Sequence, residues 1–275
     1  MTTSAAALSL SSACFSRIAE LARREAGISL SEVKKDMVQS RLARRVRANQ
    51  LDGFEAYCAM LETEATHPEH RHLINALTTN VTRFFREPHH FDELRGLLPD
   101  LAKQAAAGRK TRIWCAACST GEEPYSIALT VADAAPALMD ADFRILATDI
   151  NDEVLARARA GSYPAASLAA APREAAARHF QVEDGEARVS PKLRALIAFK
   201  ALNLIGDWPM KGKFQAIFCR NALIYFDAET QYEVVRRFGD YMAPGGTLFL
   251  GHSERVDPRL ETLFARSGLT SYRRA

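Results

Sequence analysis

Apolar residues recur every three to four positions through the first part of the chain, up to about residue 106, which is the spacing of amphipathic helices. The predicted helices cover residues 15–26, 31–49, 54–64, a stretch after Pro68, and 88–106. Gly27 is expected to end the first helix, and Ser31 is expected to cap the second. This part of the chain is therefore predicted to be helical.

The pattern changes at residue 112, where short apolar runs begin to alternate with helical segments. Strands are predicted at residues 112–115, 143–148, 214–219 and 247–250, and helices at 122–134, from 152 onward and at 228–242. Mainly apolar strand runs are typical of parallel sheets that are covered on both faces. The expected fold class is α/β with a doubly wound, Rossmann-like sheet. Residues 268–273 could add an edge strand beside 247–250.

One segment, residues 162–200, interrupts this alternation. It contains Pro164, Pro172 and Pro191, an Ala-rich stretch, and a turn within 182–189 that indicates a β-hairpin. We therefore predict a helical basic domain at 1–78, a linker with a leading helix at 79–110, an α/β domain at 111–275, and an inserted small β-subdomain at 162–200 within it.

Composition narrows the class of protein. A chain of 275 residues with 48% hydrophobic residues can bury one substantial core and a smaller one. Its five cysteines are an odd, scattered set, which argues against a disulfide framework and for a reducing compartment. The sequence shows no signal peptide and no apolar run of membrane-spanning length, so we expect a cytoplasmic protein without membrane insertion. A net charge of +3 is too balanced to indicate nucleic-acid binding by itself.

The first candidate for chemistry is the turn between the strand at 112–115 and the helix at 122–134. Ala116, Ala117 and Gly121 keep this turn thin, so a ligand can approach its backbone N–H groups. Glu122 and Glu123 would repel a pyrophosphate, and no lysine is present to bind one. The turn therefore indicates a nucleoside or a cationic ligand.

The ends of the other strands support this interpretation, because ligands of open parallel sheets bind at the carboxyl ends of the strands. Asp149 follows the strand at 143–148 and is placed to accept hydrogen bonds from both hydroxyls of a ribose. Its alternative role is to cap the next helix, which Asn151 or Asp152 could do instead. Arg220 and Asn221 follow the strand at 214–219, so a nucleoside cofactor is expected.

Six ordered blocks carry a specific resemblance: Asn-Val-Thr-Arg-Phe-Phe-Arg at 80–86, Ser-Thr-Gly-Glu-Glu-Pro-Tyr-Ser at 119–126, Thr-Asp-Ile at 148–150, Ala-Leu-Asn-Leu at 201–204, Phe-Cys-Arg-Asn-Ala-Leu-Ile-Tyr-Phe at 218–226 and Gly-His-Ser-Glu at 251–254. In this order they resemble the chemotaxis receptor methyltransferases, the CheR family, over essentially the whole chain. The resemblance implies an S-adenosylmethionine-dependent methyltransferase sheet. It also implies methyl transfer to glutamate side chains of methyl-accepting chemoreceptors, with S-adenosylhomocysteine as the product and no metal.

The resemblance also implies roles for individual residues. By position, the cofactor-binding residues are Asn80, Thr82, Arg86, Glu123, Asp149, Asn203, Leu204, Arg220 and Asn221. Arg86 and Tyr225 match the pair closest to the transferred methyl. A glutamate is already ionised at neutral pH and needs no general base, so Arg86 would orient its carboxylate and Tyr225 would donate one hydrogen bond. His89 and His90 are interpreted as helix-start or packing residues.

The expected partners are the cytoplasmic helices of chemoreceptors, which bring a monomeric enzyme close to the membrane. Residues 16–50 contain nine basic residues against four acids. Lys34, Arg41 and Arg45 could dock on the acidic methylation region of the receptor, or they could belong to a solvated surface. The short hairpin at 180–189 predicts that a C-terminal tether peptide on the receptor is not required.

Three rival functions remain to be weighed. Cys115 and Cys118 have the spacing of a redox site, but the following acids would raise a thiol pKa, and no second pair completes a zinc site. A nucleic-acid methyltransferase would suit the basic helices, but the Arg220-Asn-Ala-Leu turn lacks the Pro-Pro-aromatic motif of such enzymes. A cofactor-binding sensor or scaffold is disfavoured by the presence of both Arg86 and Tyr225.

Overall fold

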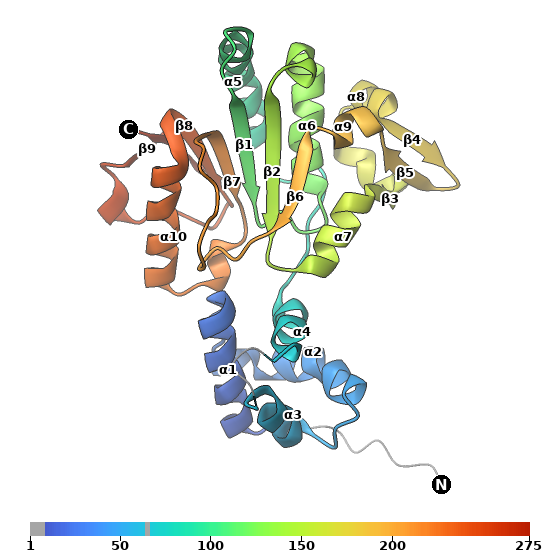
Figure 1. Cartoon of the computed structure of the whole chain (residues 1–275), viewed down its shortest axis with the longest axis vertical. Coiled ribbons are helices and arrows are strands. Elements are labelled where there is room, and N and C mark those ends of the chain that lie inside the picture. Colours follow the sequence, from blue (N-terminus) through green and yellow to red (C-terminus); the bar gives the residue numbers. More distant parts are fainter. Residues whose placement is uncertain (1–8, 64–66) are drawn as a thin grey trace. The chain divides into compact units, whose positions relative to one another are not determined.

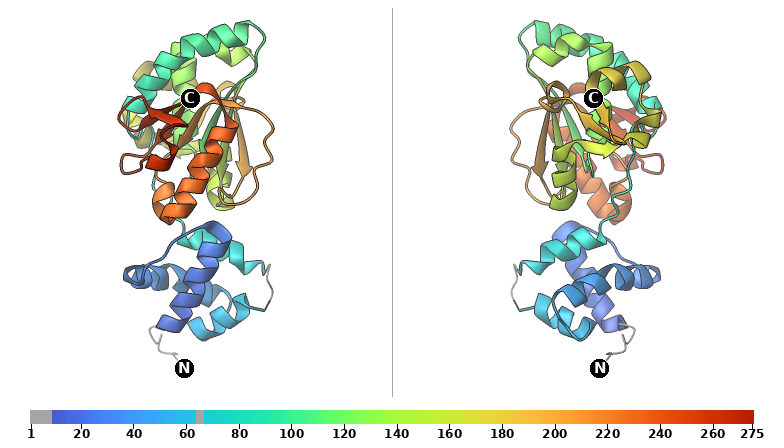
Figure 2. Two further views of the ribbon diagram at one scale, coloured as in Figure 1. Left: turned by 90° about the vertical axis from the view of Figure 1, so that its left-hand side faces the viewer. Right: turned by 90° about the vertical axis from the view of Figure 1, so that its right-hand side faces the viewer.

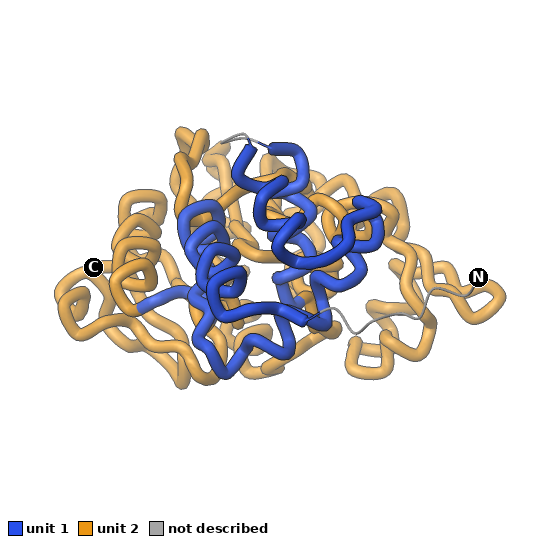
Figure 3. Tube along the Cα trace, turned by 90° about the horizontal axis from the view of Figure 1, so that it is seen from below, with its two compact units in different colours: residues 1–79, 225–227 blue, residues 80–224, 228–275 orange. Residues whose placement is uncertain are grey.

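The computed structural model describes residues 9–63 and 67–275, and the chain forms two compact units (Figure 1, Figure 3). Unit 1 contains the chain up to Thr79 together with Tyr225–Asp227. Unit 2 contains Asn80–Ile224 and Ala228–Ala275. The division falls one residue from the boundary at residue 78 that the sequence predicts. The assignment of residues 225–227 to the helical unit is new.

Unit 1 is helical, as predicted. Its α-helices are α1 (Ser12–Ala26), α2 (Lys35–Ala48), α3 (Phe54–Leu61) and α4 (Glu69–Leu77), and a 3-10 turn, Glu32–Lys34, precedes α2. Gly27 ends α1 in the left-handed conformation, with φ of 71°, as expected. Ser31 precedes the 3-10 turn but makes no side-chain capping bond. The predicted end of the third helix, at residue 64, lies outside the described residues.

Helix α2 packs against the rest of unit 1 through one apolar stripe. Val38, Leu42 and Val46 recur every four residues and are completely buried. A second apolar stripe in the same region is not buried, since Val33 is 95% exposed. The basic side chains of α2 therefore lie on a helix that is anchored along one face only. None of the helices within the described ranges combines the length and apolar character needed to cross a bilayer.

A disulfide between Cys14 and Cys58 links α1 to α3. The odd, scattered set of cysteines did not indicate this pair. One bridge in a chain of this size is not a disulfide framework. The other three cysteines, Cys115, Cys118 and Cys219, are free and buried.

Unit 2 is built on a seven-stranded sheet in the order β6-β2-β1-β7-β8-β10-β9. The strands are β1 (Thr111–Ala116), β2 (Phe143–Asp149), β6 (Ile197–Ala201), β7 (Phe214–Cys219), β8 (Met242–Leu250), β9 (Phe264–Arg266) and β10 (Ser271–Arg274). The first five strands in the spatial order are parallel, and β10 and β9 are antiparallel. The predicted α/β class is confirmed. The tail adds a strand beside β8 as expected, but this strand, β10, is not at the edge, because β9 pairs with its other side.

The central strand β1 shows why the apolar runs are nearly continuous. The main helices of the unit are α5 (His89–Ala106), α6 (Glu122–Ala134), α7 (Asp152–Ala160) and α10 (Ala228–Tyr241). Ile113 and Cys115 lie in the hydrophobic cluster that includes α5 and α6. Trp114 points to the other face and packs on Trp208 and on Phe238 of α10, with ring centroids 4.9 and 5.3 Å apart. Both faces of the sheet are therefore covered.

A three-stranded antiparallel sheet forms the inserted subdomain, in the order β3-β5-β4, and Figure 2 (right) shows it facing the viewer in yellow. Its strands are β3 (Ser162–Pro164), β4 (Phe180–Glu183) and β5 (Glu186–Val189), with short helices α8 (Arg173–His179) and α9 (Pro191–Arg194). Asp184 and Gly185 both have positive φ, 50° and 79°, as a two-residue hairpin turn requires. The predicted hairpin is confirmed.

The far boundary of this insertion differs from the prediction. Ile197–Ala201, which we assigned to the insertion, pairs in parallel with β2 and forms the edge strand β6 of the main sheet. Its residues are at best half-buried, so an edge strand lacks the apolar run that marks the central strands. The insertion therefore ends before β6.

Two phenylalanines fix the linker to unit 2. Phe84 is completely buried and meets Tyr163 and Phe180 of the subdomain edge-on, at 5.1 and 5.7 Å between ring centroids. Phe85 packs on Phe91 at 4.9 Å. Through these aromatic contacts the linker packs on the subdomain with Phe84 and on α5 with Phe85. The polar residues of 80–87 are therefore held in a defined position.

Candidate active site

The carboxyl ends of the parallel strands share one edge of the sheet, and hydrogen bonds tie their loops to the linker. Ser119, in the loop after β1, donates from its backbone N–H to Asp149 Oδ2 at 2.8 Å. The hydroxyl of the same residue donates to the carbonyl of Asn80 at 3.0 Å. Ser119 therefore joins the end of β2 to the linker.

Asp149 is the last residue of β2 and is only 7% exposed. Its Oδ2 accepts from Ser119 N at 2.8 Å, and its Oδ1 accepts from Asn151 N at 2.9 Å. Burial raises its pKa, and the backbone amides oppose that rise. Asn151 caps α7, because its side chain accepts from Glu153 N and Val154 N. The alternative role of Asp149 as a helix cap is therefore taken by Asn151.

The turn after β1 is thin, as predicted. Ala117 and Ser119 have left-handed backbones, with φ of 66° and 49°. Gly121 has φ of 100°, and a Cβ there would lie 2.6 Å from Tyr163 Oη and 2.9 Å from Ala158 Cβ. The glycine is thus required by packing against the subdomain and α7, as well as by its own conformation.

Arg220 connects three segments at this edge. It follows β7, and its side chain is 1% exposed. Nη1 donates to Glu123 Oε2 at 2.7 Å, and Nη2 donates to the carbonyl of Arg86 and lies 3.4 Å from Glu87 Oε2. The thiol of Cys115 donates to the other oxygen of Glu123 at 3.1 Å. Glu123 is therefore already paired, and its predicted contact with a cationic amino group must use its remaining acceptor capacity.

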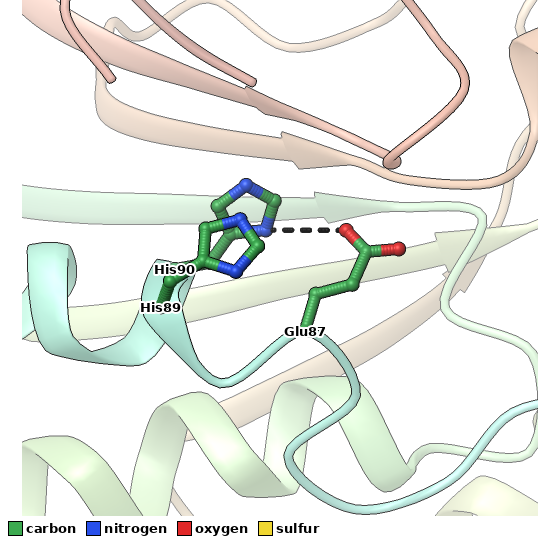
Figure 4. A group of neighbouring side chains, drawn as sticks. All are labelled: Glu87, His89 and His90. Carbon is green, nitrogen blue, oxygen red and sulfur yellow. Dashed lines mark ion pairs between the residues drawn. The ribbon is translucent and has the colours of Figure 1, made fainter. Parts of the chain in front are cut away.

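Glu87 lies beside two histidines at the start of α5 (Figure 4). His90 Nδ1 is 3.6 Å from Glu87 Oε2, and His90 Nε2 is 2.9 Å from Thr270 Oγ1. Burial, helped by Arg220 and His89, lowers the pKa of His90 to about 3, so this ring is neutral. Burial acts to raise the pKa of Glu87, but Arg220 and bonds from His252 hold it below its usual value.

The atoms of Glu87, His89 and His90 are close enough to one another to suggest a metal site. However, the Arg220 guanidinium lies 3.4 Å from the carboxylate that a metal would share. A cation placed there would meet a fixed positive charge in a buried region, which is unfavourable. Both histidines lie at the start of α5, and His90 is completely buried whereas His89 is half-buried, which agrees with the interpretation from the sequence.

The two candidate catalytic residues lie in different units. Arg86 is in unit 2, where Nη1 donates to the Val81 carbonyl at 3.1 Å and the side chain is 30% exposed. Tyr225 is in unit 1, where its carbonyl accepts from Ser29 N at 2.7 Å. Their joint action on the methyl group therefore stays a prediction.

Asn203 and Leu204, expected beside an adenine, lie in the loop that follows β6. Asn203 Oδ1 accepts from Ile205 N at 3.2 Å. Arg237 of α10 holds the same loop, because it donates to the carbonyls of Leu204 and Gly206 at 3.2 and 2.7 Å. The loop is therefore ordered by the protein itself, at the end of the strand next to Asp149.

The cysteines of the turn after β1 do not form a redox site. Burial raises the pKa of the Cys115 and Cys118 thiols well above the usual value, and the neighbouring acids Glu123 and Asp149 add to the rise. Reactive cysteines need a lowered pKa and access to solvent. Their role is packing, as the sequence indicates.

The basic residues proposed for docking have partners within unit 1. Arg45 makes two bonds of 2.7 Å to Glu69 through Nε and Nη2. Arg41 donates to the carbonyls of Leu77 and Thr78 at the end of α4, at 2.6 and 3.2 Å. Lys34 Nζ donates to the Ser29 carbonyl at 3.3 Å. Arg41 and Arg45 therefore stabilise the unit, and any docking role would be additional.

Sequence reasoning missed two acids of the site. Glu87 directly follows the block 80–86, and Glu254 ends the block 251–254. Both are largely buried and lie in hydrogen-bond networks with Arg220 or with the loop after β7. Glu254 belongs to one of the six ordered blocks, and Glu87 is adjacent to another. These positions in the sequence could have identified both acids.

Acids outnumber arginines along this edge, and the turn after β1 is thin. A buried acid at the end of the second strand is typical of a ribose site in sheets of this kind. The fold and this edge of the sheet therefore fit the class of α/β proteins that bind a nucleoside ligand at the strand ends.

Comparisons with known proteins identify the family. The family described as "CheR methyltransferase, SAM binding domain" matches residues 80–273, and "CheR methyltransferase, all-alpha domain" matches residues 13–78. A probable chemotaxis protein methyltransferase of Rhizobium etli is 44% identical over 90% of this chain and 95% of its own length. The chemotaxis protein methyltransferases of Salmonella typhimurium and Escherichia coli are each 43% identical over 96% of this chain, and over 91% and 92% of their own lengths. The chain belongs to the CheR methyltransferase family and is an enzyme that uses S-adenosylmethionine.

Proposed function

We propose that this protein transfers a methyl group from S-adenosylmethionine to glutamate side chains in the cytoplasmic helices of chemoreceptors. The product is a glutamate methyl ester that adjusts receptor signalling during adaptation. The names of the relatives support this choice of substrate. The observation that carries the proposal is the acid-rich strand edge, where the buried Asp149 ends β2 and Arg220 is buried between Glu123 and Glu87.

The residues present fit this cofactor. The Asp149 carboxylate accepts backbone N–H bonds from Ser119, Asn151 and Ile150, and an ionised carboxylate offers about four acceptor sites. Asp149 can therefore keep its backbone amides and still accept a hydrogen bond from a ribose hydroxyl. The excess of acids suits a sulfonium nucleoside better than a polyphosphate.

The reaction needs no general base. When bound, S-adenosylmethionine supplies a methyl group on a positively charged sulfur. The glutamate substrate is ionised at neutral pH, so the protein must orient it and exclude water. Arg86 uses Nη1 on the Val81 carbonyl, and its Nη2 makes no hydrogen bond to the described residues. That free edge is what would orient the carboxylate, with Tyr225 donating a further bond.

The direct test has two stages. Titration with S-adenosylmethionine and S-adenosylhomocysteine measures cofactor binding, with Asp149→Asn as the matched variant that keeps shape but loses an acceptor. A radiolabel assay on receptor cytoplasmic fragments then measures base-labile methyl ester. We expect binding that Asp149→Asn weakens, and ester formation on receptor glutamates. Absence of cofactor binding would remove the enzyme function, and binding without transfer would favour a sensor or another acceptor.

We further propose that the receptor docks on the exposed face of α2. Arg44 and Arg47 are exposed, and neither side chain forms a hydrogen bond or ion pair with any residue that the structure describes. Free basic side chains on one helix suit an acidic receptor helix, and such pairing weakens as salt rises. Lys34, Arg41 and Arg45 remain candidates, but their internal bonds make them poor tests of docking.

Paired variants separate docking from folding. Arg44→Glu with Arg47→Glu should raise the receptor KM in a salt-dependent way and leave the melting temperature and the affinity for S-adenosylhomocysteine unchanged. Arg45→Glu, the matched control, should lower the melting temperature because it places two carboxylates together. An unchanged receptor KM in the first variant would exclude α2 as the docking face.

Independence from a receptor tether peptide remains part of this proposal. The strands β4 and β5 have four residues each, joined by a two-residue turn, so the hairpin offers little surface. Receptor fragments with and without their C-terminal tail should be methylated at similar rates. A marked loss without the tail would contradict this and would point to strand addition at β4, the edge of the subdomain sheet.

A further inference from the structure

Glu254 is a buried carboxylate that binds backbone amides of two strand-end loops. It is 4% exposed. Its Oε2 accepts from Gly251 N at 2.6 Å, just after β8, and from Asn221 N at 2.9 Å, just after β7. Its Oε1 accepts from Ile224 N at 3.3 Å, and Leu223 N also bonds to the carboxylate. One side chain therefore holds the whole segment from Asn221 to Ile224.

The packing around this carboxylate leaves no space for a side chain at Gly251. A Cβ at Gly251 would lie 2.8 Å from Asn221 N and 2.8 Å from Glu254 Oε2. Asn221 itself has φ of 59°, a left-handed conformation that an asparagine tolerates but does not favour. The close approach of two backbone segments and an unfavourable backbone angle occur together. Glu254 supplies the hydrogen bonds that stabilise this arrangement.

No ion pair to the Glu254 carboxylate occurs among the described residues, so its charge is compensated by amides alone. Burial raises its pKa, and the backbone bonds oppose the rise. All of its bonds in the structure are accepted rather than donated, which is the pattern of the ionised form. Burying an ionised carboxylate costs free energy. Its presence therefore indicates that these backbone amides need an acceptor that a neutral side chain would not provide.

The segment that Glu254 holds carries candidate functional residues. Asn221 is expected to contact the cofactor, and the chain runs from Ile224 directly into Tyr225, which is expected near the transferred methyl. We propose that Glu254 is a positioning residue for methyl transfer, which fixes the segment between Asn221 and Tyr225 through backbone amides without touching the reactants. This inference rests on the proposed methyltransferase reaction and adds a residue to it.

The central test is Glu254→Gln, which keeps size but replaces one acceptor oxygen with a donor that faces backbone N–H groups. Misplacement of reacting groups by about 1 Å costs roughly 100-fold in rate. We expect kcat to fall about 100-fold, measured with saturating receptor fragment and cofactor. The Kd for S-adenosylhomocysteine should rise less than about tenfold, because Asp149 and Asn203 do not depend on Glu254. A purely structural role would change the melting temperature without this split between kcat and Kd.

Glu69→Gln is the matched control. Glu69 is also 4% exposed and hydrogen-bonded, but it lies in unit 1 and bonds to Arg45. It should lower the melting temperature and leave kcat unchanged. If Glu254→Gln does not fold, Gly251→Ala disturbs the same contact from the other side and should produce the same loss of kcat.

The outcomes separate this inference from the proposed function. If the wild-type protein binds no cofactor or transfers no methyl group, the proposed function fails. If the wild-type protein is active and Glu254→Gln or Gly251→Ala retains kcat within about twofold, the positioning role is wrong. Equal losses of kcat in Glu254→Gln and Glu69→Gln would also overturn it, because they would indicate a general loss of stability.

Discussion

Each unit of this protein contains an arginine that pairs with a shielded carboxylate, and the arginine side chain is 25% exposed in unit 1 and 1% exposed in unit 2. The two pairs also differ in how many of their polar atoms have a hydrogen-bond partner. In unit 1, Arg45 meets Glu69 with two bonds of 2.7 Å, and the Tyr57 hydroxyl adds a third at 3.0 Å. The Glu69 side chain is 5% exposed. Every charged oxygen has a donor, so this pair is a complete structural contact between α2, α3 and α4.

In unit 2, Arg220 lies between two acids, Glu123 and Glu87. Its Nε and Glu87 Oε2 are buried and have no hydrogen-bond partner among the described residues. The backbones of Glu87 and of Asn221, next to Arg220, are left-handed, with φ of 57° and 59°. This pair is therefore incompletely satisfied and surrounded by unfavourable backbone conformations.

The difference indicates what each pair does. Unsatisfied buried groups and strained backbone persist where the surrounding structure holds them in place, and they concentrate at functional sites. The Arg45 pair stabilises a small helical unit. The Arg220 network instead holds three segments, the linker, the start of α6 and the end of β7, in the positions that a ligand site requires.

Replacement of Arg220 should produce the largest effect. Arg220→Ala leaves Glu123 and Glu87 buried without their cation, which costs about 3–5 kcal/mol of folding free energy. It should also lower kcat/KM by at least about 100-fold, because the linker and the strand ends lose their common contact. Chemical denaturation and the methyl-ester assay measure the two effects.

Arg45→Ala is the control for this comparison, since it also leaves a buried glutamate unpaired. It should cost a similar folding free energy but leave the Kd for S-adenosylhomocysteine unchanged. If both variants lose cofactor affinity equally at temperatures where they are folded, the contrast between the two pairs is wrong.

The left-handed backbone at Asn221 allows a more specific test of the cofactor site, with a smaller expected effect. Asn221→Gly keeps the left-handed conformation and removes the side chain, so it should weaken S-adenosylhomocysteine binding about tenfold, as expected for one lost hydrogen bond. Unfolding free energy should change little. Asn221→Ala adds backbone strain of about 1 kcal/mol to the same loss of side chain. Calorimetric titration that gives wild-type affinity for Asn221→Gly would show that the side chain has no role in binding.

The sequence predicted the parts of the fold that depend on local patterns. The helices of unit 1, the parallel strands and the hairpin follow from spacing and turn residues, and Asp149 and Arg220 were placed at strand ends for the same reason. The edge strand β6 was assigned to the insertion, because half-exposed residues lack an apolar run. Local pattern therefore located the candidate site but not the limits of the inserted subdomain.

Long-range partners could not be predicted in the same way. Arg220 contacts Glu123 and the Arg86 carbonyl, which are 97 and 134 positions away. Arg45 was interpreted as a surface residue because its partner Glu69 lies 24 positions further on. A sequence shows which residues are charged, whereas only the folded chain shows which charges are neutralised. The functional interpretation of α2 changes for this reason.

The pH dependence of folding should reveal the satisfied pair of unit 1. Burial acts to raise the pKa of Glu69, but bonds from Arg45, Tyr57 and Asn49 bring it below its usual value of 4.5. A lowered folded pKa contributes stability that is present above about pH 4.5 and is lost as the pH falls through the folded pKa. Glu69→Gln should lower the unfolding free energy at pH 7 by about 1–3 kcal/mol and flatten its decline in acid. Denaturation curves between pH 7 and pH 3 that remain parallel for both proteins would contradict this role.

The smallest effect is expected at the cysteines beside the Arg220 network. Cys118 is buried, and its thiol pKa is raised, so Cys118→Ala should change kcat by less than about twofold, whereas a redox site would lose its function with either cysteine. Activity is the correct readout, because reductant would also open the Cys14–Cys58 disulfide and could change the melting temperature of unit 1. The measurement of kcat is repeated in protein that also carries Cys14→Ser and Cys58→Ser, which has no disulfide for a reductant to open. Loss of transfer in Cys118→Ala at unchanged cofactor affinity would mean that the turn after β1 contributes thiol chemistry, and that Arg220 and its acids alone do not account for the site.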